Sequence, residues 1–194
     1  MSSKPGRRIV IGLVTLLAIQ AAAVAVYFAV QRSRDESKVS AFRVEQLRGD
    51  TAAPDIELER ADGSRLSVHD LDSRVRLVHF WATWCPPCVE ELPGLLATSR
   101  KLSDRGLTLV AISMDDDWTK IRAFFGGAVP PEVYRAVEPD AHEKYDIVSL
   151  PDTYLVPRND RLQLRYGGAR DWRSHEALSH LRGQLPARGS PVPP

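Results

Sequence analysis

The chain contains two cysteines, Cys85 and Cys88, which stand two residues apart directly behind a short apolar run. A Cys-x-x-Cys pair at the start of a helix can form and break one disulfide, so this spacing indicates thiol–disulfide exchange. A helix N-terminus favours a thiolate through its dipole and its unpaired backbone N–H groups. We therefore expect Cys85 to be the nucleophile. Cys88, one turn deeper, would be the thiol that resolves the mixed disulfide.

Two other uses of the pair fit the sequence less well. A tetrahedral zinc site needs four ligands, but the chain has no second cysteine pair, and the spacing of His175 and His180 places them on different helix faces. A purely structural disulfide would close a very short loop, which restricts the unfolded chain little. We expect no metal, and no cofactor beyond the redox-active disulfide.

The elements that position the pair can be predicted from apolar patterning. A strand over residues 74–81 becomes more apolar toward its end and leads into the motif, as a central strand would. Apolar residues at helical spacing predict a helix over 89–104 that ends near Gly106 and is kinked by Pro93. The other expected elements are a β-hairpin (55–59 and 65–68), strands over 107–113, 132–137, 153–156 and 162–166, and helices ending at 125 and spanning 141–145 and 172–185. This order predicts an α/β fold with a mixed central sheet flanked by helices.

Three consecutive aspartates, at 115–117, could be mistaken for a metal site. Consecutive side chains diverge, and helix N-termini favour acidic residues. We expect these aspartates to cap the helix that follows them.

The N-terminal residues predict a membrane anchor. No charged residue occurs between Arg8 and Arg32, and residues 9–30 are about as long as the ~20 residues with which a helix crosses a bilayer. Basic residues on both sides make the positive-inside bias weak. A cleaved signal peptide is the alternative, because Ala23-Val24-Ala25 resembles a cleavage site. With either an anchor or a cleaved signal peptide, the folded domain would be exported from the cytoplasm.

The expected organisation has five parts. They are a cytoplasmic N-terminus (1–8), a transmembrane helix (9–30), a juxtamembrane linker (31–52), a folded domain (53–186) and a disordered tail (187–194). The formal net charge is +1, and no basic stripe with interleaved aromatic residues occurs, so nucleic acid is not an expected partner. The predicted anchor makes the lipid bilayer an expected partner.

Several further motifs surround the pair. They are the run 78–88, Pro93, Leu150-Pro151, the opening Ala53-Pro54-Asp55, the turn Asp62-Gly63, Glu91 three residues after Cys88, Asn159-Asp160 and residues 168–172. With the anchor, this set resembles the exported TlpA/ResA-like thiol–disulfide oxidoreductases of the thioredoxin superfamily, over about residues 53–185. The resemblance implies a thioredoxin-like fold with an N-terminal β-hairpin and one N-terminal transmembrane helix.

The resemblance also implies roles for residues around the pair. Pro151 would be a cis-proline that faces the active site, and Leu150 would offer backbone groups to an extended substrate peptide. Trp84 and Pro86 would contact the substrate as well. Glu91 would be a buried or half-buried acid–base group that tunes the thiols, the alternative being a solvated acid in the first turn.

His79 departs from the family pattern. It lies two residues before Trp81, where relatives carry aspartate or asparagine. Strand alternation puts it on the face of Leu77 and Trp81, under the motif helix. Imidazole titrates near working pH, so His79 is a candidate acid–base group that relays a proton to Cys88. A neutral histidine hydrogen-bonded in the core is the equal alternative.

The two prolines between the cysteines bear on the direction of electron flow. Pro86 and Pro87 carry no N–H, which removes two donors to the Cys85 thiolate. A moderately stabilised thiolate is typical of a reductant. We therefore expect the redox potential of the pair to lie nearer that of thioredoxin, about −270 mV, than that of strong periplasmic oxidants, roughly −120 mV. A thiol oxidase or isomerase remains an alternative, because the same two thiols serve both directions.

The expected function is reduction of disulfides in partner proteins by a single-pass protein of the bacterial inner membrane, with its catalytic domain on the periplasmic side. The resemblance implies a membrane electron donor of the DsbD or CcdA type. It also implies clients such as apocytochrome c, in cytochrome c maturation, or copper-centre assembly factors. A Cu(I)-handling protein is the other alternative, because soft thiolates suit that ion. A peroxiredoxin-type peroxidase does not fit. Its reactive cysteine lies in a Thr-x-x-Cys motif, whereas Thr83 lies only two residues before Cys85.

Overall fold

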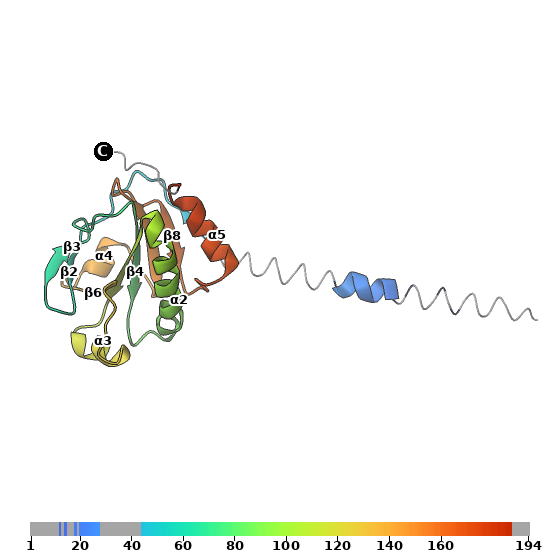
Figure 1. Cartoon of the computed structure of the whole chain (residues 1–194), viewed down its shortest axis with the longest axis horizontal. Coiled ribbons are helices and arrows are strands. Elements are labelled where there is room, and N and C mark those ends of the chain that lie inside the picture. Colours follow the sequence, from blue (N-terminus) through green and yellow to red (C-terminus); the bar gives the residue numbers. More distant parts are fainter. Residues whose placement is uncertain (1–11, 13, 15–17, 19, 28–43, 188–194) are drawn as a thin grey trace, which may run out of the picture. The chain divides into compact units, whose positions relative to one another are not determined.

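The structure is a computed structural model that divides into two units, residues 1–41 and 42–194. It describes residues 12, 14, 18, 20–27 and 44–187 (Figure 1). Residues 20–27 of the first unit are helical. No helix within the described residues has both the length and the apolar character needed to cross a membrane. The predicted N-terminus (1–8), much of the predicted anchor and linker, and nearly all of the predicted tail lie outside the described residues.

A mixed sheet of eight strands forms the centre of the second unit (Figure 1). Its strands are β1 (Glu45–Gln46), β2 (Glu57–Glu59), β3 (Arg65–Ser67), β4 (Val75–Trp81), β5 (Leu107–Ser113), β6 (Val133–Ala136), β7 (Asp152–Pro157) and β8 (Leu164–Gly167). Their spatial order is β1-β8-β7-β4-β5-β6-β2-β3. Strand β4 pairs in parallel with β5 and antiparallel with β7, and every residue of β4 is buried. The strand that leads to the cysteine pair is therefore central, as predicted.

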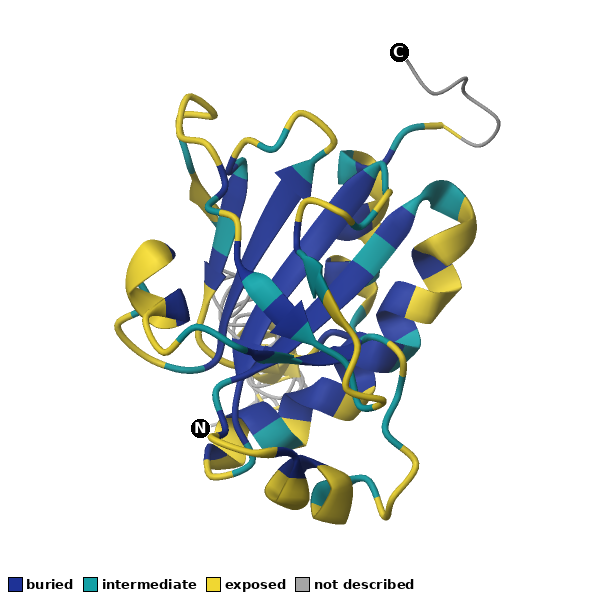
Figure 2. Cartoon of the chain, turned by 90° about the vertical axis from the view of Figure 1, so that its left-hand side faces the viewer, coloured by how far each residue is buried: buried dark blue, intermediate teal, exposed yellow. Residues whose placement is uncertain are grey.

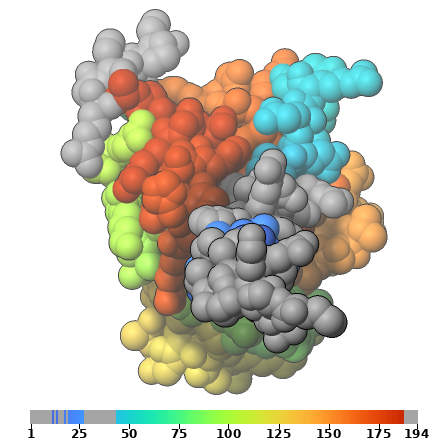
Figure 3. Space-filling model, turned by 90° about the vertical axis from the view of Figure 1, so that its right-hand side faces the viewer, coloured from blue at the N-terminus to red at the C-terminus, as the bar shows by residue number. Residues whose placement is uncertain are grey.

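Helices supply the apolar side chains that cover the sheet. They are α2 (Pro86–Leu102), followed by the 3₁₀ turn η1 (Ser103–Arg105), then α3 (Trp118–Phe124), α4 (Ala141–Lys144) and α5 (His175–Gln184). Helices α2, α3 and α5 contribute to one apolar cluster and α4 to a second, and both clusters include side chains of the sheet. Figure 2 shows buried residues along the central strands and yellow, exposed positions on the helices. In Figure 3, α5 (red) lies beside the light-green end of α2, where the Arg105 side chain donates to the Leu185 carbonyl at 3.2 Å.

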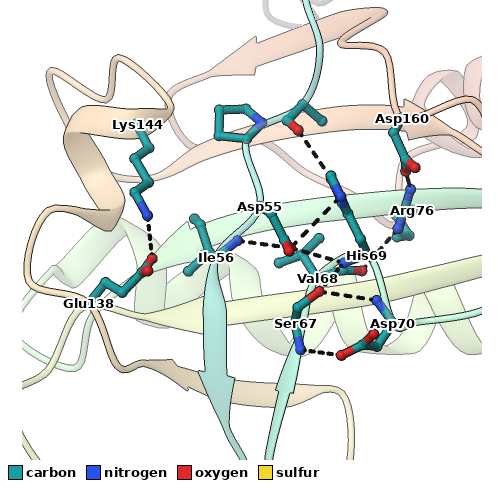
Figure 4. A network of polar contacts seen from close by, with 12 residues as sticks. Asp55, Ile56, Ser67, Val68, His69, Asp70, Arg76, Glu138, Lys144 and Asp160 are labelled. Carbon is teal, nitrogen blue, oxygen red and sulfur yellow. Dashed lines mark hydrogen bonds and ion pairs between the residues drawn. The ribbon is translucent and has the colours of Figure 1, made fainter.

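A polar network fastens the opening of the folded unit to the β2–β3 hairpin (Figure 4). Asp55 Oδ1 accepts a hydrogen bond from the backbone N–H of His69 at 3.2 Å, and His69 Nε2 lies 3.1 Å from the Ala53 carbonyl oxygen. Arg76 of β4 forms an ion pair with Asp160. Ala53 belongs to the second apolar cluster and both cysteines belong to the first. This network therefore supports the sheet from the face opposite to the cysteine pair.

The structure confirms the predicted α/β fold with its N-terminal hairpin, but two helices begin three residues away from their predicted starts at 89 and 172. Helix α2 starts at Pro86, because proline is tolerated in the first turn, where no N–H is needed. It runs through Pro93 to Leu102, and Gly106 follows η1 at φ 84°. Helix α5 starts later than predicted because Ser174 caps it.

One strand was not predicted. Strand β1, within the stretch predicted to be a linker, pairs antiparallel with β8 and extends the edge of the sheet. It is two residues long and both are exposed, so it carries no apolar alternation that the sequence could reveal.

Candidate active site

The cysteine pair occupies the N-terminus of α2. Cys85 and Cys88 form a disulfide, and the sulfur of Cys85 accepts the backbone N–H of Cys88 at 3.4 Å as the helix cap. Pro86 and Pro87 fill the first two helical positions, so the N–H of Cys88 is the first that the helix offers. Cys85 is 6% exposed and Cys88 is fully buried. Cys85 is thus the more exposed of the two cysteines, and its role as the nucleophile stays a prediction.

Asp115 holds the loop that joins β4 to the pair. Its carboxylate accepts hydrogen bonds from the Thr83 backbone N–H at 2.9 Å and hydroxyl at 2.6 Å, and from the Ser113 hydroxyl at 2.7 Å. The sequence predicted a capping role for residues 115–117. Asp117 does cap α3, accepting from Thr119 N at 2.6 Å, whereas Asp115 is buried and turns to the motif loop. Among the described residues, no cluster of three or more histidine, cysteine or acidic side chains could hold a metal.

A groove of about 650 Å³ lies beside the nucleophile. Its lining consists of Trp84, Cys85, Pro86, Pro87, Met114, Pro139, His142, Ile147, Val148, Ser149 and Leu150. Trp84 and Val148 are large apolar side chains left 62% and 91% exposed. Three predicted substrate contacts, Trp84, Pro86 and Leu150, thus line one groove with Cys85. Pro151, which follows in a cis peptide bond, is buried and is not part of this lining.

One part of the groove lining was not predicted from the sequence. This part, the 139–149 wall, consists of lining residues between positions 139 and 149, a stretch that includes α4 and ends just before Leu150 and the cis-proline. Ile147 and Val148, two apolar residues in a polar stretch just before Ser-Leu-Pro, were the available signal. The exposure of Val148 in the fold, rather than its residue type, marks it as a contact residue, while Ile147 is half-buried against the second apolar cluster.

Glu91 lies one turn along α2 from Cys88 and is only 7% exposed. Its Oε2 accepts hydrogen bonds from the Arg170 backbone N–H at 2.7 Å and from Trp172 Nε1 at 3.2 Å. Burial raises the pKa of Glu91 from 4.5 to about 7, against the lowering effect of Arg170 and Trp172. Glu91 is also one of the residues that line a surface cavity of about 430 Å³. Glu91 is thus buried, and can exchange a proton near neutral pH.

His79 is fully buried between Glu91 and Thr153. Its Nδ1 lies 2.9 Å from the Thr153 hydroxyl oxygen and its Nε2 lies 3.8 Å from Glu91 Oε1. Burial, and to a smaller extent the charge of Arg170, lowers the pKa of His79 to about 3, so the imidazole is neutral at working pH. Both ring nitrogens therefore face groups other than the cysteines, and a proton relay to Cys88 through His79 stays a prediction.

Replacing Glu91 with Gln should flatten the pH dependence of stability of the oxidised protein between about pH 4.5 and 7. Folding raises the pKa of this carboxyl, so the native protein binds more protons than the unfolded chain across that window. The wild-type free energy of unfolding should fall as pH rises through it, by an amount of order 3 kcal/mol. Gln keeps an acceptor for Arg170 and Trp172 but has no proton to lose.

Urea unfolding of both proteins at several pH values measures this difference. Glu90→Gln, on the exposed side of the same turn, is the matched control and should retain the wild-type profile. If the free energy of unfolding changed with pH in the same way for wild type and Glu91→Gln, Glu91 would not titrate in this range.

Comparisons with known proteins agree with this geometry. A model of the Redoxin family matches residues 47–169, which include the cysteine pair, Glu91, His79 and Pro151. The thiol-disulfide oxidoreductase ResA of Oceanobacillus iheyensis is 31% identical over 166 residues, which are 80% of this chain and 79% of that protein. ResA of Bacillus subtilis is 27% identical over 115 residues, 58% of this chain and 63% of the relative. A solved structure from Chlorobium tepidum, described as a thiol:disulfide interchange protein DsbE, is 27% identical with a TM-score of 0.58, over 72% of this chain and 96% of that one.

Proposed function

The chain belongs to the Redoxin family and is a thiol–disulfide oxidoreductase, and from this premise we propose that it reduces disulfides in partner proteins. The observation that carries the proposal is the difference between its two sulfurs. Cys85 lines an open apolar groove, whereas Cys88 is fully buried one turn below it. One sulfur is placed to meet a protein, and the other can react only with the first.

The proposed reaction has two exchange steps. In the reduced enzyme the Cys85 thiolate attacks one sulfur of a client disulfide, which forms a mixed disulfide and releases the other client sulfur as a thiolate. The Cys88 thiolate then attacks Cys85, the mixed bond breaks, and the client leaves with two thiols. Two electrons pass to the client, and the enzyme keeps the Cys85–Cys88 disulfide.

The groove supports a protein client rather than a small one. Apolar side chains exposed beside a reactive group are typical of protein contact sites. Trp84 stands on the cysteine side of the groove, and Val148 belongs to the 139–149 wall. An extended client segment lying along Leu150 would bring its disulfide to Cys85, and Pro151 would then lie at the end of the groove next to the exchange.

Glu91 supports the proton transfers that the thiols require. Cys88 must lose a proton before it can attack, and a nearby group with a pKa near neutral is the most effective acceptor. The pKa of Glu91, raised by burial to about 7, meets this condition. Glu91 is therefore the proposed acid–base group of the pair.

The proposed site of action is the outer side of the bacterial cytoplasmic membrane. The uncharged run over residues 9–30 supports an anchor that would leave the folded unit outside the cytoplasm. A reductant in an oxidising compartment must be recharged, so a membrane donor of the DsbD or CcdA type is the proposed source of electrons. Apocytochrome c and copper-centre assembly factors are the first clients to test.

The redox potential tests the direction of electron flow. We expect the equilibrium potential of the pair to lie below about −180 mV, the value typical of a disulfide isomerase. Pro87→Ala should raise it by about 30 mV, because the restored N–H can donate to the Cys85 thiolate and stabilise the reduced form. Pro93→Ala, in the same helix beyond the reach of the sulfur, is the matched control.

The two measurements have separate meanings. A wild-type potential above about −180 mV would overturn the reductase and favour the oxidase or isomerase, which use the same thiols. Equal potentials for Pro87→Ala and Pro93→Ala would show that missing N–H groups do not set the potential.

A further inference from the structure

Two buried polar atoms face each other beneath the motif helix without a hydrogen bond. His79 Nε2 and Glu91 Oε1 lie 3.8 Å apart on side chains that are 0% and 3% exposed. Within the described part of the chain, neither atom has a hydrogen-bond partner. Buried polar atoms are nearly always paired, and an approach of about 0.6 Å would bring these two within N–H···O range. Each atom is thus a possible hydrogen-bond partner of the other after a small movement.

Thr153 on β7 makes the opposite side of His79 adaptable. The Thr153 hydroxyl oxygen lies 2.9 Å from His79 Nδ1. A hydroxyl can donate or accept, and a neutral imidazole has one N–H and one lone pair. When Nδ1 carries the hydrogen, it donates to Thr153 and leaves Nε2 as an acceptor. When Nε2 carries it, Nδ1 accepts from the Thr153 hydroxyl instead.

We propose that His79 is a positioning residue whose tautomer follows the protonation state of Glu91. The protonated carboxyl donates from Oε1 to Nε2, with the ring hydrogen on Nδ1. The carboxylate accepts from Nε2–H, with the ring hydrogen moved to that nitrogen. The two states differ by one proton, which is exchanged with solvent through the cavity that Glu91 lines. The proposal deepens the proposed function and rests on it, since it concerns the acid–base group of that reaction.

The surroundings favour a neutral ring in both states. Strands β5 and β7 place Ala111 and Thr153 beside His79, so neither brings a charge to it. The titratable and charged groups of the other neighbouring elements are Cys88, Glu90 and Glu91 on α2, and Arg170, Asp171 and Arg173 after β8. Arg170 is 8% exposed, with its guanidinium over the rings of Tyr166 and Trp172 at 5.2 and 5.5 Å. Its positive charge opposes an imidazolium and favours the carboxylate.

Nitrogen-15 NMR of the oxidised wild-type protein reads the tautomer directly, because protonated and unprotonated imidazole nitrogens resonate far apart. Between pH 5 and 9 we expect the His79 hydrogen to move from Nδ1 to Nε2, with a midpoint near 7. Glu91→Gln should abolish the change, since its amide does not titrate. Thr153→Ser keeps the hydroxyl and should retain the change, whereas Thr153→Val should shift its midpoint or remove it.

A single tautomer across the whole range, or an imidazolium with both nitrogens protonated, would overturn the proposal. A tautomer change that persists in Glu91→Gln would do the same. These measurements use the oxidised protein and need no client, so they succeed or fail separately from reductase activity. A wild-type protein that switches tautomer but reduces no protein disulfide would remove the proposed function and leave the His79–Glu91 coupling in place.

Discussion

Cys88→Ser will accumulate a mixed disulfide between Cys85 and its client and will lose multiple turnover. The first exchange step needs only Cys85, which remains at the groove. The second step needs a thiolate at position 88, and a serine hydroxyl cannot break the mixed bond. Turnover should fall by about a thousandfold or more, the scale on which removal of an essential catalytic group acts. Non-reducing gels with mass spectrometry of the adduct measure both effects and identify the client.

The reciprocal variant is the matched control. Cys85→Ser keeps a thiol at position 88, but that thiol is fully buried, so no adduct should form. Expressed in bacteria with the full N-terminus, Cys88→Ser should yield its adduct in the membrane fraction, with a client that is itself exported. If Cys85→Ser formed an adduct on Cys88 at a yield similar to that of Cys88→Ser, the proposed roles of the two sulfurs would be wrong. A cytosolic client would contradict the proposed location.

The two sides of the cysteine pair have different chemistry. Toward the surface, Cys85 meets an apolar groove with exposed Trp84 and Val148. Toward the core, Glu91 and His79 are buried, and Glu91 lines a second cavity that shares Pro87 with the groove. The other residues that line this cavity are not groove residues, so a client in the groove would leave them uncovered.

Elements with a strong local signal were predictable from the sequence. The β4 strand is a continuous apolar run, the β2–β3 hairpin alternates around Asp62-Gly63, and the cysteine spacing is itself the motif. Each signal is contained in a few neighbouring residues. Trp84 and Pro86 lie within the cysteine motif itself, and the family resemblance, rather than apolar patterning, implied their contact with the substrate.

Contacts between distant segments were not predictable. Asp115 holds Thr83 from 32 residues away, and Arg170 and Trp172 reach Glu91 from 79 and 81 residues away. Such pairs depend on strand order and on where a loop returns, which apolar periodicity does not encode. Alternation along β4 correctly placed His79 under the motif helix. It could not tell that the ring would face Glu91 and Thr153.

Asp115→Ala should destabilise the oxidised protein by about 3 kcal/mol, because three hydrogen bonds to one buried carboxylate are lost together. The Thr83 backbone N–H has no freedom to find another direction, while the Thr83 and Ser113 hydroxyls can rotate. Asp115→Asn keeps an acceptor oxygen for that N–H and should lose less. Chemical unfolding at pH 7 measures the free energy of each variant.

Asp116→Ala provides the matched control, since it removes the neighbouring carboxylate from an exposed position. Its effect should stay within about 0.5 kcal/mol, as for most surface substitutions. Equal losses of unfolding free energy at the two positions would mean that negative charge near the start of α3, rather than the hydrogen bonds from Thr83 to Asp115, stabilises this region. A large loss confined to Asp115 would instead show that the loop presenting Cys85 is held in place by a residue at the end of the neighbouring strand. The pairing of β4 with β5, which brings Asp115 to Thr83, would then determine the position of Cys85 as directly as helix α2, which Cys85 caps.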